Sequence, residues 1–211
     1  MKRPLFIARQ AGNPKGPIGA VLARIMARET VVENSRALSL LKLQPTDYIL
    51  EVGAGHGATI KTAAEIVYNG FVAGLDISHV MVRRAEQANK QNINEGRVDI
   101  LLASSDRIPF SDATFSKALA VHTVYFWDQP ASHFSEILRT LIPGGLFLLC
   151  FRPAEDEAFA ETFPSSVYHI RGTEDLLSGL RQTGFEIDSV NTETGKRGTL
   201  IFATARKPSK S

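Results

Sequence analysis

The stretch ILEVGAGHGATI, residues 49–60, constrains the fold of this chain more than any other segment. An apolar run typical of a buried strand passes directly into three glycines at alternate positions, Gly53, Gly55 and Gly57, and then into residues with helical spacing. Glycine adopts backbone conformations that other residues rarely reach, and it lets a ligand approach the main chain. A helix that begins beside such a turn presents free N–H groups. The stretch therefore predicts a strand, a ligand-binding turn and a helix, in that order.

Strand-like and helix-like segments continue to alternate after this turn. Continuous apolar runs predict strands at FVAGLDI (71–77), VDILLA (98–103), FSKALAVHT (115–123) and LFLLCF (146–151), with amphipathic helices between them. Strands that are apolar on both faces are typical of a parallel sheet covered by helices on both sides. The chain is therefore predicted to be α/β, with a doubly wound, mostly parallel sheet.

The end of the chain breaks this alternation. FEIDSVNTET and GTLIFATARK, residues 185–194 and 198–207, are joined by the short polar turn GKRG, which predicts a C-terminal antiparallel hairpin. The helix before LFLLCF is predicted to begin at Pro130 and to end at the Pro143–Gly145 stop.

Ahead of the sheet, helical spacing predicts two helices, around residues 18–25 and 31–41. The predicted organisation is an N-terminal helical lid or cap (1–43), a ligand-binding domain (44–206) and a flexible tail (207–211).

Composition excludes several classes of function. A net charge of +2 over 211 residues, without a long basic run, excludes a typical nucleic-acid binder. No apolar run approaches the length of about 18 residues that spans a bilayer, so stable membrane insertion is not expected. The single cysteine, Cys150, lies in an apolar strand and is interpreted as a buried, inert thiol of a cytoplasmic protein. No His or acidic pair shows metal-ligand spacing, and nothing specifies the oligomeric state.

The glycine turn is compatible with three kinds of binding motif, each for a different ligand. A P-loop is disfavoured because Ile60 occupies the position of its second glycine. The dinucleotide pattern G-x-G-x-x-[GA] is satisfied, and Asp76 follows at the end of the next strand, where a carboxylate accepts hydrogen bonds from ribose hydroxyls. The third alternative also accounts for Glu51, which stands two residues before Gly53.

The third alternative rests on a resemblance. EVGAGHG (51–57) resembles the E-x-G-x-G-x-G motif of class I S-adenosylmethionine-dependent methyltransferases, and GLDIS (74–78) resembles their ribose-binding segment. The likeness continues through ASSDRIPFSDATFSKALAVHTVYFWDQP (103–130) and FSEILRTLIPGGLFLL (134–149), and extends from about Leu43 to Arg206. It implies a seven-stranded sheet with an antiparallel hairpin, the cofactor S-adenosyl-L-methionine and transfer of a methyl group by in-line displacement.

The resemblance also implies a set of cofactor-binding residues. These are Glu51, Gly53, Ala54, Gly55, Asp76, Ile77, Met81, Ser104, Ser105 and His122. Glu51 is expected to accept from the ammonium group, Asp76 to bind the ribose and Ile77 to pack on adenine. The family often has Asp where Ser104 stands, so adenine recognition is assigned to the Ser104 hydroxyl, to Asp106 or to the backbone of Ser105.

His122 and Tyr125 are the predicted catalytic residues. Both follow the fourth strand, where a proton acceptor would serve a hydroxyl substrate. The aromatic residues of VYFWD (124–128) are interpreted as walls of a pocket for a small, partly apolar acceptor. His56 is expected to be exposed, and His79 and His133 to lie on helix surfaces.

Two further functions stay open. One is an NAD-dependent oxidoreductase on a similar fold, and the other is a non-catalytic protein that retains cofactor binding.

Overall fold

The computed structural model of the chain describes residues 4–16, 30–195 and 198–209. The helix predicted around residues 18–25 lies outside these ranges. Within them, no helix is both long enough and apolar enough to cross a membrane.

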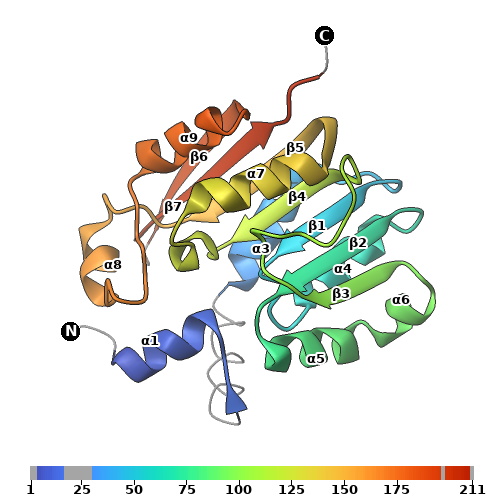
Figure 1. Cartoon of the computed structure of the whole chain (residues 1–211), viewed down its shortest axis with the longest axis horizontal. Coiled ribbons are helices and arrows are strands. Elements are labelled where there is room, and N and C mark those ends of the chain that lie inside the picture. Colours follow the sequence, from blue (N-terminus) through green and yellow to red (C-terminus); the bar gives the residue numbers. More distant parts are fainter. Residues whose placement is uncertain (1–3, 17–29, 196–197, 210–211) are drawn as a thin grey trace.

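Seven strands form one sheet in the order β3-β2-β1-β4-β5-β7-β6 (Figure 1). The strands are β1 Tyr48–Val52, β2 Phe71–Asp76, β3 Val98–Leu102, β4 Phe115–Val121, β5 Leu141–Phe151, β6 Glu186–Gly195 and β7 Gly198–Arg206. Strands β1 to β5 pair in parallel, whereas β7 runs antiparallel to both β5 and β6. The predicted sheet and its C-terminal hairpin are confirmed, with the reversed strand one position in from the edge.

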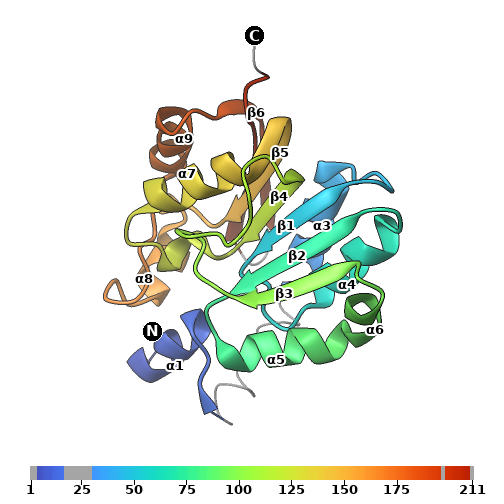
Figure 2. The same ribbon diagram turned by 45° about the vertical axis from the view of Figure 1, so that its right-hand side comes forward.

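Helices cover both faces of this sheet (Figure 2). They are α1 Leu5–Gly12, α3 Val31–Leu41, α4 Ala58–Ile66, α5 His79–Ala88, α6 Lys90–Asn94, α7 Pro130–Thr140, α8 Glu157–Thr162 and α9 Thr173–Gln182. One apolar cluster packs α3, α4 and α5 against the sheet, and another packs α7 and α9 against it. The neighbours Ile49 and Leu50 belong to different clusters, as a strand buried on both faces requires. Cys150 is buried, as predicted.

The junction between α7 and β5 differs from the prediction. Helix α7 ends at Thr140, and β5 begins at Leu141, so the Pro143–Gly145 turn lies within the strand as an irregularity of its ladder with β4. Lys207 fixes this junction, since its ammonium group donates to the carbonyl of Leu141 at 2.7 Å. The residue that was assigned to a flexible tail therefore makes a tertiary contact that helix-stop patterns do not encode.

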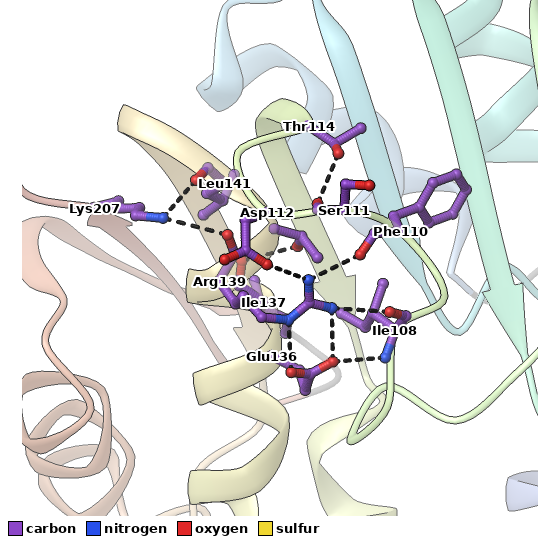
Figure 3. A network of polar contacts seen from close by, with 11 residues as sticks. Ile108, Phe110, Ser111, Asp112, Thr114, Glu136, Ile137, Arg139, Leu141 and Lys207 are labelled. Atoms are coloured by element: carbon purple, nitrogen blue, oxygen red, sulfur yellow. Dashed lines mark hydrogen bonds and ion pairs between the residues drawn. The ribbon is translucent and has the colours of Figure 1, made fainter.

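Arg139 of α7 fastens the loop between β3 and β4 (Figure 3). Its guanidinium group donates to the carbonyls of Ile108 and Phe110, at 2.9 and 2.8 Å, and to the carboxylate of Asp112 at 2.7 Å. Glu136, one turn earlier, accepts from Arg139 and from the backbone N–H of Ile108. The hydrogen bond from Arg139 holds the pKa of Glu136 below its ordinary value. These contacts hold the later part of the loop, which leads into β4, against the end of α7.

Candidate active site

A cavity of about 700 Å³ lies at the carboxyl ends of the parallel strands, where open α/β sheets bind their ligands. Tyr125 and all the predicted cofactor-binding residues line it: Glu51, Gly53, Ala54, Gly55, Asp76, Ile77, Met81, Ser104, Ser105 and His122. Helix α1, the start of α3, α8 and the segment around Tyr168 contribute further parts of the wall. The residues predicted from the sequence patterns therefore line one cavity, while their individual roles stay predictions.

Glycine is required at the three positions of the turn for different structural reasons. All have positive φ angles: +78° at Gly53, +55° at Gly55 and +82° at Gly57. A Cβ atom on Gly53 would lie 2.1 Å from the Thr123 side chain, and one on Gly57 would lie 2.8 Å from the Cα of Ala85. A Cβ atom on Gly55 would meet no described atom closer than 4.0 Å. Gly55 therefore keeps space open on the cavity side, whereas the other two permit close packing.

Asp76 is held in place by the glycine turn itself. The backbone N–H of Gly55 donates to one carboxylate oxygen at 2.9 Å, and the N–H of Ser78 donates to the other at 2.8 Å. Burial raises the pKa of Asp76, and these backbone hydrogen bonds oppose the rise. The oriented carboxylate keeps acceptor capacity beyond its backbone hydrogen bonds, so it suits the hydroxyl groups of a ligand.

Glu51 is a buried acid at the end of β1. The residue is only 5% exposed, and its Oε2 atom has no hydrogen-bond partner among the described residues. Burial raises the pKa of Glu51 to about 8; a hydrogen bond from Thr59 opposes the rise, and the charge of Asp76 adds to it. A buried carboxylate without a partner is costly unless a ligand supplies the missing donor. The environment of Glu51 therefore favours a cationic donor in the cavity.

Ile77, Met81 and Ser104 line the part of the cavity expected to hold adenine. Ile77 is 47% exposed, which fits a residue that packs on a ligand. Ser105 is buried, and its hydroxyl lies 2.7 Å from Nδ1 of His133.

Two histidines lie differently from the prediction. His133 is only 9% exposed, because Trp127 stacks on its ring at 4.5 Å and Ser105 bonds it from the loop after β3. His56 is half-buried and lines the cavity, and burial lowers its pKa. Helical spacing and glycine neighbours do not reveal the loops that cover these rings. His79 is exposed, as predicted.

His122 lies directly after β4 with a φ angle of +58°, a conformation in which His and Asn are enriched. Its backbone N–H donates to the carbonyl of Cys150 at 2.9 Å, and its Nδ1 atom lies 3.1 Å from the Tyr125 hydroxyl. The backbone N–H of Arg152 donates to the same hydroxyl at 2.5 Å. Burial raises the pKa of Tyr125, so its phenol stays protonated and this environment disfavours the predicted role of Tyr125 as a proton acceptor.

An aromatic compartment adjoins His122. Phe126 packs on Tyr168 at 5.0 Å between ring centroids, Tyr168 on Phe163 at 4.5 Å, and Phe163 on Phe159 at 4.6 Å. All four residues line the cavity. The predicted aromatic wall after β4 therefore faces a second wall that α8 and the segment after it contribute.

Charged groups mark one end of this compartment. Glu33 of α3 is buried, and its carboxylate lies 4.0 Å from the guanidinium group of Arg152. The Arg152 guanidinium also lies 5.7 Å from the centre of the Phe159 ring. Asp156 caps α8 through the N–H of Phe159 and accepts from the N–H of Thr199 at 2.8 Å. The compartment thus combines apolar walls with a polar end.

Sequence reasoning missed Glu33, Thr59, His133, Arg152 and Tyr168. Two of them carried a usable signal: Thr59 lies in the first turn of the helix after the glycine turn, and Arg152 directly follows the strand β5. Glu33, His133 and Tyr168 come from segments that resemble an ordinary helix or loop, and packing brings them to the cavity.

S-adenosylmethionine fits these residues. Its methionine end carries an ammonium group, for which the unpartnered oxygen of Glu51 is an acceptor. Its ribose carries two hydroxyls, which the oriented carboxylate of Asp76 can receive. A diphosphate at the same turn would instead lie against the buried acid of Glu51, which is electrostatically unfavourable.

Comparisons with known proteins lead to the same family. Residues 50–149 match the family described as "Methyltransferase domain". The chain is 30% identical over 169 residues to 24-methylenesterol C-methyltransferase 2 of Oryza sativa subsp. japonica, an alignment that covers 79% of this chain and 46% of that protein. It is 25% identical over 184 residues to the uncharacterized methyltransferase YdaC of Bacillus subtilis (strain 168), covering 87% and 96% of the two chains. The chain thus spans less than half of the rice protein but nearly all of YdaC.

The fold also matches the crystal structure of a SAM-dependent methyltransferase from Aquifex aeolicus. The TM-score is 0.69 at 19% identity, and the match covers 82% of this chain and 89% of that one. Likeness at this identity shows the fold alone, and the matched domain supplies the family. The chain belongs to the class I S-adenosylmethionine-dependent methyltransferases.

Proposed function

We propose that the protein transfers a methyl group from S-adenosylmethionine to a small, partly apolar acceptor. The observation that carries the proposal is the buried, unpartnered oxygen of Glu51 in the same cavity as the aromatic compartment of Phe126, Phe159, Phe163 and Tyr168. One end of the cavity suits the zwitterionic end of the cofactor, and the other suits a flat or branched apolar molecule with a polar group.

When bound, S-adenosylmethionine supplies a methyl group on a positively charged sulfur, which departs as a neutral thioether. The chain's own residues therefore need mainly to align the two reactants and to exclude water. Glu51 would accept from the ammonium group of the cofactor, and Asp76 would accept from its ribose hydroxyls. The aromatic walls keep water from the acceptor, and His122 lines the same cavity.

The N-terminal segment, residues 1–43, serves in this proposal as the cap of the cavity. Ala11, Gly12 and Pro14 line it, and the Ser78 hydroxyl donates to the carbonyl of Pro14 at 2.7 Å. A Cβ atom on Gly12 would lie 2.6 Å from the Phe126 ring, so α1 packs directly on the aromatic wall. These contacts tie the cap to both parts of the cavity.

Calorimetric titration with S-adenosylmethionine and with NAD tests the cofactor. We expect binding of the sulfonium compound only, at least tenfold weaker in Glu51→Gln, because the variant removes the charge that faces the ammonium group. Glu65→Gln on the exposed face of α4 is the matched control and should bind as the wild type does. Binding of NAD without affinity for S-adenosylmethionine would establish the dehydrogenase alternative.

Transfer itself is tested with methyl-labelled S-adenosylmethionine and a panel of small phenols, thiols, amines and prenylated compounds. We expect label in partly apolar members of the panel. Tight cofactor binding with no labelled product from any class would favour the non-catalytic alternative.

A further inference from the structure

The hydroxyl of Tyr125 lies between two nitrogen atoms. The backbone N–H of Arg152 is 2.5 Å away, and Nδ1 of His122 is 3.1 Å away. An amide nitrogen can only donate, so one lone pair of the phenol oxygen is occupied by the Arg152 N–H. The phenol carries a single proton, and the remaining question is where that proton points.

Burial answers this question. Tyr125 is 3% exposed, and a buried hydroxyl that donates to no acceptor is destabilising. Nδ1 of His122 is the acceptor that the described residues offer to this O–H. If Nδ1 carried a proton instead, the phenol oxygen would accept twice and its own proton would have no acceptor among the described residues. The hydrogen-bond pattern therefore assigns the phenol proton to the bond with Nδ1.

The tautomer of His122 follows from this assignment. A neutral imidazole carries one proton, so a ring whose Nδ1 accepts a hydrogen bond has its proton on Nε2. The ring is also restrained, because it stacks on the Tyr125 ring at an interplanar angle of 21° and its backbone N–H is bonded to Cys150.

We propose that Tyr125 is a positioning residue that holds His122 as the neutral Nε2–H tautomer, so that His122 acts as a hydrogen-bond donor and not as the base of the reaction. The inference rests on the proposed methyl transfer. It specifies the acceptor class: the nucleophilic atom reaches the cavity already free of a proton, as in an ionised phenol, a thiolate or a neutral amine. The acceptor's lone pair forms the bond to carbon, the pair of the broken carbon–sulfur bond stays on sulfur, and no proton moves to the protein.

Nitrogen-15 NMR of the histidine side chains in the full chain tests the tautomer without turnover. His122→Asn identifies the His122 signals, and Asn suits the positive φ angle at this position. At a pH where the ring is neutral, we expect the wild type to show Nε2 protonated and Nδ1 as a hydrogen-bond acceptor. Tyr125→Phe should give a mixture of both tautomers. Tyr68→Phe, at an exposed position, is the control and should match the wild type.

Two results would overturn the inference. One is a wild-type ring with its proton on Nδ1, and the other is a folded Tyr125→Phe protein with the wild-type spectrum. If Tyr125→Phe does not fold, the wild-type spectrum alone decides. Titration with S-adenosylmethionine separates the two proposals, since failure to bind it refutes the methyl transfer, whereas a Nδ1–H ring refutes only the role assigned to Tyr125.

Discussion

At the level of single residues, Glu51 shows how burial in a binding site perturbs the pKa of an acid. Its carboxyl group is buried, and burial raises its pKa to about 8, far above the ordinary value for glutamate. The folded protein therefore holds a proton that the unfolded chain releases near pH 4.5. Between these pH values the folded state binds more protons than the unfolded state. The contribution of Glu51 to the free energy of unfolding therefore falls as pH rises.

Cofactor affinity should carry the opposite pH dependence. The ammonium group of the cofactor favours ionised Glu51, so binding below pH 8 releases a proton, and we expect affinity to rise about tenfold between pH 6 and pH 7. Calorimetry in two buffers of different ionisation enthalpy measures that proton. Glu51→Gln should bind weakly with no proton release. A wild type that binds without releasing a proton would contradict this role of Glu51.

Among the structural elements, the glycine turn joins β1 to α4, and its glycines serve two different purposes. Gly57 allows close packing, whereas Gly55 leaves space for a ligand. Gly57→Ala should destabilise the fold by about 2–4 kcal/mol, because its Cβ would press on Ala85 of α5 at a positive φ angle. Gly55→Ala should cost only about 1 kcal/mol, since its Cβ would enter open space, yet it should abolish cofactor binding. Urea denaturation and calorimetric titration measure the two effects. Equal stability loss in both variants would argue against this division.

Local sequence patterns predict the strands correctly but misplace the end of α7. The apolar strands were predicted because a parallel strand buried on both faces has a continuous apolar sequence. The end of α7 was placed at Pro143–Gly145, whereas it lies at Thr140, because a tertiary bond from Lys207 and pairing with β4 extend β5 backward. Long-range contacts of this kind leave no local pattern.

At the scale of the whole molecule, one buried ion pair ties the start of the sheet together. The Lys117 ammonium of β4 lies 2.6 Å from the carboxylate of Asp47, and it also donates to the carbonyl of Lys42 at 2.9 Å. Burial alone would raise the pKa of Asp47, but hydrogen bonds from Lys117, Gln44 and Ser116 hold it below its ordinary value. The stability that Asp47 contributes is therefore present at neutral pH and is lost as pH falls through its folded-state pKa.

Asp47→Asn should cost about 3–5 kcal/mol at pH 7, because it leaves the Lys117 ammonium buried without its counter-ion. The double variant Asp47→Asn, Lys117→Met should recover much of that loss, since it removes the buried charge. Asp188→Asn, at the half-exposed pair with Arg206, should cost less than about 1 kcal/mol. Urea denaturation measures all three. A double variant no more stable than Asp47→Asn would show that the pair does not act through charge burial.

The order of the elements, the glycine turn and the edge where ligands bind all follow from local patterns in the sequence. Parallel strands end at the same edge, so Glu51, Asp76, Ser104 and His122 had to meet once their strands were recognised. Only the tertiary structure decided which side chains complete the cavity. Glu33 of α3, Phe159 of α8 and Tyr168 come from segments far apart in the chain, and no periodicity relates them. Their positions depend on how helices pack on the sheet, because burial and hydrogen bonding between distant segments exist only in the folded chain.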